Sequence, residues 1–148
     1  MLKARRNSYD GYGNRTIKSA RDVEAAMKDL GFPQRELYAE AFVPFEKELA
    51  AMVARGKDGM VRVYPVVETR QQSHICKWVV APAPVSAAVQ QRARDLAVAA
   101  IEAVHGVGIF GVELFATADG TVLVNELAPR PHNTGHYTLD ADCASQFE

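Results

Sequence analysis

The stretch that decides the fold is residues 108–128, GIFGVELFATADGTVLVNELA. Two runs rich in β-branched and aromatic residues flank Asp119-Gly120, which is the pattern of a β-hairpin. A two-residue turn at this point places Glu113 directly opposite Glu126 on the neighbouring strand. The hairpin therefore predicts two carboxylates on one rung of an antiparallel sheet.

Two opposed carboxylates point to a bound cation. Like charges on one rung repel, and a cation between Glu113 and Glu126 would remove that penalty. Oxygen-only ligands favour Mg²⁺, or Mn²⁺, over zinc, and Asn125 next to Glu126 adds one more oxygen. A second interpretation stays open: a bulge that shifts the register would leave the two glutamates independently solvated.

The remaining elements surround this hairpin. A short amphipathic helix is expected to begin at Ser19, with Asp22 as its capping-box partner, and to stop at Gly31; a long one spans about residues 86–104. Lys57-Asp58-Gly59 is expected to join two strands as a hairpin. The predicted fold class is α+β, with two main helices and mostly antiparallel sheets. Strands are expected at residues 37–43, 48–55, 60–67, 75–81, 109–117 and 121–127.

We expect two lobes in one fragment of a larger protein. Residues 1–83 are predicted to form the first lobe and residues 84–148, with the long helix and the carboxylate hairpin, the second. The chain opens on a basic strand-like stretch, and SQFE at residues 145–148 is typical of a first helical turn. Both ends therefore look like cuts, with flanking domains expected on either side.

The composition excludes several classes of protein. The 148 residues are 48% apolar and 24% charged, with a formal net charge of −1, so no global field would attract nucleic acid or an anionic membrane. No apolar run approaches the roughly 18 residues of a membrane helix. Cys76 and Cys143 belong to no Cys-x-x-Cys pair, which favours reduced thiols in a cytoplasmic protein. We expect neither a nucleic-acid nor a membrane partner.

A glycine-rich segment, YDGYGN at residues 9–14, follows Lys3. Glycines let backbone N–H groups approach a phosphate closely, and the lysine supplies charge, which suits a mobile flap over a nucleotide. A plain turn between two short strands explains the same residues. The segment is neither a Walker loop nor a Rossmann fingerprint.

Another candidate segment, APRPHNTGH at residues 128–136, directly follows the carboxylate strand. Its prolines stiffen it, and Arg130, His132, Asn133 and His136 offer hydrogen-bond donors for a small oxyanion beside the metal. An ordinary hydrogen-bonded loop is the alternative. A zinc site from His132 and His136 is disfavoured, because Gly135 and the prolines oppose the helix that such a pair uses.

A nucleotide base could contact the segment that precedes Pro44. A strand edge there could offer backbone groups to an adenine, and Glu48 a few residues later could accept the ribose hydroxyls. Sheet packing explains these residues equally well. The segment consists of Glu40, Ala41, Phe42 and Val43.

Five motifs, in this order, resemble the ATP-grasp domain of the carboxyaminoimidazole ribonucleotide synthetase family, the ATP-dependent half of phosphoribosylaminoimidazole carboxylase. Their wording is nearest the fungal and plant enzymes, where a carboxylase (mutase) domain is fused to this one. The resemblance implies that ATP, held between two sheets, phosphorylates bicarbonate, and that carboxyphosphate then carboxylates aminoimidazole ribonucleotide in purine biosynthesis. The motifs are YDGYGN (9–14), YAEAFVPFEKELA (38–50), YPVVET (64–69), GIFGVELF (108–115) and NELAPRPHNTGHYT (125–138).

The resemblance also implies a role for each candidate residue. Glu113 and Glu126 would hold Mg²⁺ with Asn125 nearby, and Glu48 would bind the ribose of ATP. Tyr9 and Asp10 would approach the ribonucleotide. The phosphates would contact Lys3, Tyr9, Asp10, Gly11, Gly13 and Asn14; the adenine would contact Glu40, Ala41, Phe42 and Val43; and bicarbonate would be oriented by the catalytic candidates Arg130, His132 and Asn133.

Two positions depart from the family pattern. Tyr12 stands where the flap usually has Arg or Lys, and Gln71 stands where a histidine usually reaches the nucleotide, so both lose donors near phosphate. The alternative function is therefore a non-catalytic nucleotide-binding remnant of the same fold. Thr134, where serine is usual, is a mild change. Because the family's flanking domains complete the active site, we expect the isolated chain to be inactive, and the full-length enzyme to be an oligomer.

Overall fold

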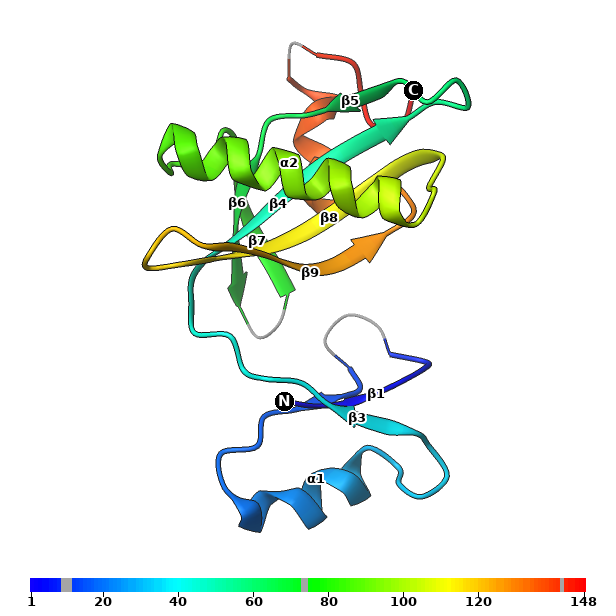
Figure 1. The fold of residues 1–148 in the computed structure, drawn as a ribbon, viewed down its shortest axis with the longest axis vertical. Helices are drawn as coiled ribbons and strands as arrows, with labels where there is room; N and C mark the ends of the chain where they lie inside the picture. Colours follow the sequence, from blue (N-terminus) through cyan, green and yellow to red (C-terminus); the bar gives the residue numbers. More distant parts are fainter. Residues whose placement is uncertain (9–11, 73–74, 142) are drawn as a thin grey trace. The chain divides into compact units, whose positions relative to one another are not determined.

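The computed structural model describes residues 1–8, 12–72, 75–141 and 143–148 (Figure 1). Two compact units are present: a small one of residues 1–43, and a large one of residues 44–72 and 76–148. The division at residue 43 differs from the expected lobe boundary at residue 83. The reason is that the strand after Pro44 pairs along its whole length with a strand near the C-terminus, which joins residues on both sides of position 83 in one sheet.

The small unit is a three-stranded antiparallel sheet with one short helix. The strand order is β2-β1-β3. The Ser19 N–H donates to Asp22 Oδ2 at 2.8 Å, so the predicted capping box is present, and Gly31 has a φ of +86° just after the helix. The elements are β1 (Leu2–Ala4), β2 (Asn14–Arg15), the 3₁₀ helix η1 (Ala20–Asp22), α1 (Val23–Asp29) and β3 (Leu37–Ala39).

The large unit is a six-stranded antiparallel sheet with one long helix. The order is β7-β6-β4-β8-β9, and β5 pairs with β4 beyond the end of β6. Ser86 caps the helix by accepting from the Val89 N–H at 3.3 Å. The elements are β4 (Phe45–Arg55), β5 (Val61–Val63), β6 (Val67–Gln72), β7 (Ile75–Val80), α2 (Ala87–Ala103), β8 (Gly108–Thr117), β9 (Val122–Ala128) and the 3₁₀ helix η2 (Asn133–Leu139).

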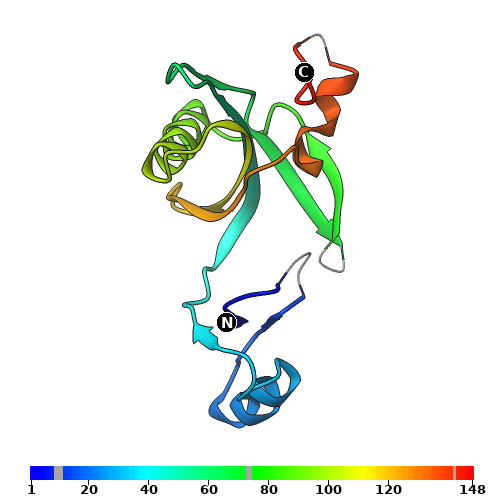
Figure 2. The same ribbon diagram turned by 90° about the vertical axis from the view of Figure 1, so that its right-hand side faces the viewer.

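The two faces of the central strands carry different side chains. On one face α2 covers β4, β8 and β9 (Figure 1). Ala93, Ala97 and Ile101 of the helix are fully buried. The other face is contacted by η2, which lies on the opposite side of the sheet from α2 (Figure 2). The strand residues of the α2 face are apolar: Leu49, Ala51, Val53, Phe110, Val112, Leu114, Ala116 and Val122.

The α+β class with mostly antiparallel sheets is confirmed, but two strand boundaries are corrected. The strand expected over residues 37–43 ends at Ala39, and residues 40–44 are irregular up to Pro44, which cannot donate to a sheet ladder. The strand expected over 60–67 is two strands, β5 and β6, separated at Pro65. Among the described residues, none of the helices combines the length and apolarity that crossing a membrane requires.

Candidate functional site

Glu113 on β8 directly opposes Glu126 on β9, as predicted. The turn that produces this pairing is longer than the expected two-residue turn. The Thr117 N–H donates to the Thr121 carbonyl at 2.9 Å, so the hairpin loop comprises residues 118–120, with Gly120 at a φ of +83°. Taken alone, this longer loop would pair Glu113 with Asn125.

A β-bulge restores the pairing of the glutamates. The register shifts between Glu113 and Leu114, because Leu114 faces Val124 while Glu113 faces Glu126, and Asn125 is the extra residue. Asn125 Nδ2 then lies 3.4 Å from Glu113 Oε2 as a donor. The bulge therefore does not separate the two carboxylates, as the alternative interpretation required; it adds the Asn125 amide to them.

The Glu113 carboxyl is half-buried, and its environment favours the neutral form. Burial raises the pKa of Glu113, while the hydrogen bond from Asn125 and the charge of Arg130 act in the opposite direction with smaller effect. The exposed Glu126 carboxylate adds a second negative group on the same rung. A cation bound here would stabilise the ionised form of both groups.

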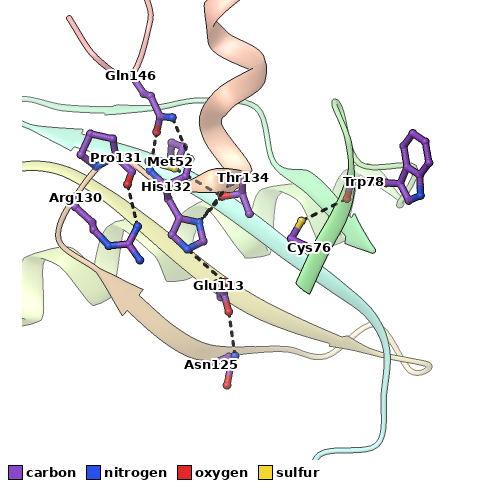
Figure 3. A network of polar contacts seen from close by, with 10 residues as sticks. All are labelled: Met52, Cys76, Trp78, Glu113, Asn125, Arg130, Pro131, His132, Thr134 and Gln146. Atoms are coloured by element: carbon purple, nitrogen blue, oxygen red, sulfur yellow. Dashed lines mark hydrogen bonds and ion pairs between the residues drawn. The ribbon is translucent and has the colours of Figure 1, made fainter. Parts of the chain in front are cut away.

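His132 lies against Glu113 on the same face of the sheet (Figure 3). Its Nε2 is 3.5 Å from Glu113 Oε1, its Nδ1 is 2.9 Å from Thr134 Oγ1, and its side chain is 11% exposed. Gly111 makes this approach possible, because a Cβ at that position would lie 2.7 Å from the Cβ of His132. The glycine before Val112 in the hairpin motif is thus a requirement of the histidine's position.

The other donors predicted in the segment 128–136 lie at the surface. Arg130 is exposed and donates from Nη1 to the Pro131 carbonyl at 3.1 Å, and Asn133 and His136 are also exposed. The expectation that Gly135 would exclude a helix is wrong in part, since η2 begins at Asn133 as a 3₁₀ helix. A glycine is required within this helix, because a Cβ at Gly135 would lie 2.7 Å from Met52 Cγ.

Glu48 lines a small depression of the large unit together with Glu113 and Asn125. Glu48 is half-buried and opposes Phe115 on β8, and the Phe115 ring stacks on Phe45 with centroids 4.4 Å apart. The depression also contains Gln71, the position where the family pattern has histidine. Its lining comprises Glu48, Leu49, Thr69, Gln71, Glu113, Leu114, Phe115 and Asn125.

The small unit brings together three of the predicted nucleotide-binding residues. Lys3 on β1 forms an ion pair with Glu40, just after β3, and Lys3 faces Asn14 across the β1–β2 pair. In the described part of the glycine-rich segment, Gly13 has a φ of +91°, Tyr12 is 71% exposed, and Asn14 begins β2. Tyr9, Asp10 and Gly11 lie outside the described residues.

The segment expected to meet adenine lies almost wholly outside the strands. Glu40 adds one backbone pair beyond the end of β3, because its N–H donates to the Met1 carbonyl at 2.9 Å and the Met1 amino group donates to the Glu40 carbonyl at 2.8 Å; residues 41–43 belong to no strand. Ala41 and Phe42 are exposed and Val43 is half-buried, so this short stretch keeps accessible side chains within the small unit. Its predicted contacts with a base stay predictions.

The donor set at the carboxylates fits a magnesium ion. It consists of two carboxylates, which are hard oxygen ligands, with the Asn125 amide beside them and its Nδ2 toward Glu113. The described residues contain no cluster of three or more His, Cys, Asp or Glu side chains arranged around a metal position. Mg²⁺ needs no such cage, because it is usually bound through one or two carboxylates, waters and the phosphates of a substrate.

The sequence patterns did not predict two polar clusters that the structure contains, one around Glu68 and one around Gln146. Glu68, on β6, accepts from Lys47 Nζ at 2.6 Å and from Arg70 Nε at 2.9 Å, and these cations, Lys47 foremost, lower its pKa against the opposing effect of burial. Gln146 bonds the backbone of His132. The contacts of Lys47 with Glu68 and of Gln146 with His132 join residues distant in the sequence, so no local pattern indicates them.

Comparison with known proteins gives one family and a consistent set of relatives. The ATP-grasp domain model matches residues 1–147. The phosphoribosylaminoimidazole carboxylase of Ogataea methanolica is 53% identical over 148 residues, which are 100% of this chain and 27% of that protein. The chain thus spans about a quarter of this relative's length.

Two solved fungal structures have the same fold. The carboxyaminoimidazole ribonucleotide synthase of Aspergillus clavatus complexed with ATP has a TM-score of 0.92 and 45% identity, covering 99% of this chain and 38% of that one. The same organism's enzyme with ADP and 5-aminoimidazole ribonucleotide has a TM-score of 0.89 and 43% identity, covering 99% and 37%. The match of the family model over almost every residue shows that the chain belongs to the ATP-grasp domain family.

Proposed function

We propose that the chain is the ATP-grasp part of an enzyme that uses ATP and bicarbonate to carboxylate aminoimidazole ribonucleotide in purine biosynthesis. The observation that carries this proposal is the rung of Glu113 and Glu126, with the Asn125 amide and the His132 ring beside it. Support comes from relatives named for this reaction, and from similar structures with ATP, ADP and the ribonucleotide bound.

The large unit supplies the proposed metal and ribose contacts. Glu113 and Glu126, with Asn125 nearby, would hold Mg²⁺, which would neutralise charge on the transferring phosphoryl group when bound. Glu48 would accept the ribose hydroxyls from the same depression that Glu113 and Asn125 line. The half-buried position of Glu113 strengthens its attraction to a cation, because solvent screens it less.

His132, Arg130 and Asn133 would orient bicarbonate. His132 lies against Glu113 at the edge of the metal position, and Arg130 and Asn133 flank it with exposed donors. Bicarbonate must present one oxygen to the γ-phosphorus of ATP, so donors that fix a small anion raise its effective concentration in that geometry. The carboxyphosphate product would keep the same partners until the ribonucleotide amine attacks it.

The small unit would bind the other parts of the nucleotide. Lys3 would contact phosphates, aided by the backbone around Gly13 and Asn14 and by the predicted flap residues Tyr9, Asp10 and Gly11. Residues 40–43 would contact adenine. Lys3 is paired with Glu40 in the structure, so a phosphate would compete with that carboxylate for the ammonium group.

One experiment tests the proposal in a complete protein. We would replace the matching residues of the Ogataea methanolica relative by this chain, and measure ADP formation that depends on both bicarbonate and aminoimidazole ribonucleotide. The chimera should be active, and Glu126→Gln should lower kcat/KM for ATP by about 100-fold, the size expected for losing one electrostatic contact to the transition state. The isolated chain should bind nucleotide weakly without turnover, because substrate-positioning parts are missing.

The alternative is a non-catalytic nucleotide-binding module, and Gln71 is the observation that favours it. Gln71 lines the depression beside Glu48 and Glu113, so a lost histidine there would affect the site directly. This alternative predicts a folded chimera that binds ATP without turnover, and recovery of activity in the Tyr12→Arg, Gln71→His double variant. An inactive chimera that those changes restore would therefore contradict the main proposal.

A further inference from the structure

Gln146 is a buried glutamine whose side chain bonds both backbone groups of His132. The His132 N–H donates to Gln146 Oε1 at 2.9 Å, and Gln146 Nε2 donates to the His132 carbonyl at 3.0 Å (Figure 3). The residue is 4% exposed. A carboxamide carries a donor and an acceptor in one plane, so it can pair with a peptide backbone as another strand would.

The surroundings of Gln146 fix this carboxamide in place. Its backbone N–H donates to Thr138 Oγ1 at 3.0 Å, and that hydroxyl donates in turn to the Gly135 carbonyl at 2.7 Å. Gly135 leaves the space that the carboxamide fills, because a Cβ there would lie 2.5 Å from Gln146 Oε1 and 2.7 Å from Met52 Cγ. Thr138 and Gly135 are both buried, so the arrangement is shielded from water.

The consequence reaches the imidazole ring. The backbone at His132 is fixed by Gln146, and the ring is then held at Nδ1 by Thr134 and at Nε2 by Glu113. Each of these two residues makes one contact with the imidazole, and one contact does not by itself fix the orientation of the ring. The paired bonds from Gln146 remove the freedom of the backbone that carries the ring.

We propose that Gln146 is a positioning residue for His132, and that it sets the ring in the orientation used toward bicarbonate. The second half of this statement rests on the proposed function of His132. Gln146 touches no substrate in this scheme. It acts through the backbone of His132, and its removal should loosen the ring while the sheet and α2 stay folded.

The test uses the 148-residue chain and NMR spectroscopy. In Gln146→Met, which keeps the length of the side chain and removes both hydrogen bonds, the His132 amide should exchange with solvent at least about tenfold faster. The ¹⁵N signals of the His132 ring should move from the values of a ring held at both nitrogens toward those of a ring that exchanges between its two tautomers. Gln90→Met is the matched control. Gln90 Nε2 also donates to a backbone carbonyl, that of Ala83 at 3.1 Å, but both residues are distant in the sequence from His132.

A second variant covers the case in which Gln146→Met does not fold. Gln146→Leu also removes both hydrogen bonds and has a smaller apolar side chain, so it should loosen the ring in the same way. Unchanged ring signals and unchanged amide exchange in either folded variant would overturn the positioning role.

A titration separates this inference from the proposed function. Bicarbonate is added to the chimera with the Ogataea methanolica relative, which keeps the substrate-positioning parts, in the presence of Mg²⁺ and ADP, and the His132 ring signals are followed. A wild-type response that needs about tenfold more bicarbonate in Gln146→Met supports both statements. A wild-type ring that ignores bicarbonate removes the proposed role of His132, and a response of equal midpoint in both proteins removes the role of Gln146.

Discussion

The two faces of strands β4 and β8 have different roles in the large unit: one forms the hydrophobic core and the other carries the candidate site. On one face Leu49 opposes Leu114 and Ala51 opposes Val112, and α2 covers them completely. On the other face Ala50 opposes Glu113, and polar groups gather around that carboxylate. Because successive residues of a strand point to opposite faces, alternate residues of one strand can belong to the core and to the candidate site. Stability and ligand binding should therefore respond to different substitutions.

The largest effect is expected on the covered face. Ile101 of α2 is fully buried against the sheet, so Ile101→Ala should lower the free energy of unfolding by about 2–5 kcal/mol. Urea denaturation measures this loss. Val104→Ala is the control, because Val104 follows the same helix and is 53% exposed. A loss under about 1 kcal/mol for Ile101→Ala would mean that α2 does not complete the core.

The second largest loss of stability is expected at Gly111, which lies against His132 on the site face. Gly111→Ala places a Cβ 2.7 Å from that of His132, so the loop must move, at a cost of about 1–3 kcal/mol in unfolding free energy. The same substitution should cost less in a His132→Gly background, since the opposing Cβ is then absent. Equal costs in the two backgrounds would show that Gly111 is required for another reason.

The ion pair of Glu68 and Lys47 tests how much a buried charge contributes to stability beside the core. Glu68 opposes Leu49 and is buried with Lys47, so Lys47→Met should destabilise the chain by about 1–3 kcal/mol at neutral pH. The pKa of Glu68 is lowered in the folded state, so the pair stabilises above the ordinary glutamate pKa and loses this contribution as the pH falls through the lowered value. Melting curves between neutral and acidic pH should converge for wild type and variant; a difference independent of pH would contradict the pair's role. Lys57→Met, in an exposed turn, is the control.

The sequence predicted the covered face better than the site face. Helix α2 follows from its apolar periodicity and the Ser86 cap, and hairpin β8–β9 follows from Asp119-Gly120 between β-rich runs. The opposition of Glu113 and Glu126 was also predicted, although the loop length was wrong and a bulge at Asn125 corrected the register. Local patterns suffice where the determining contacts are local or periodic.

The polar contacts around His132 could not be predicted in the same way. The bonds from Gln146 join residues whose separation gives no pattern, and Gly111 and Gly135 make sense only once the groups they admit are in place. The strand predicted over residues 37–43 was too long for a similar reason. Its end at Ala39 depends on the following Pro44 and on the length over which β3 pairs with β1, and neither effect is a pattern within the segment. The division of units at residue 43 depends on the long pairing of β4 with β8, which is also tertiary.

The smallest expected effect tests the central claim, that Glu113 and Glu126 form one cation site on the site face. Thermal melts of wild type and Glu126→Gln are compared with and without Mg²⁺ and a non-hydrolysable ATP analogue, with Glu102→Gln on the exposed side of α2 as control. In metal-free buffer Glu126→Gln should be as stable as wild type, or more stable by about 0.2–1 kcal/mol, because a like-charge rung is relieved. With Mg²⁺ and the analogue the order should reverse, since wild type gains stability by binding and the variant gains much less. A variant that is less stable without metal and equally stabilised by the ligands would contradict the shared site.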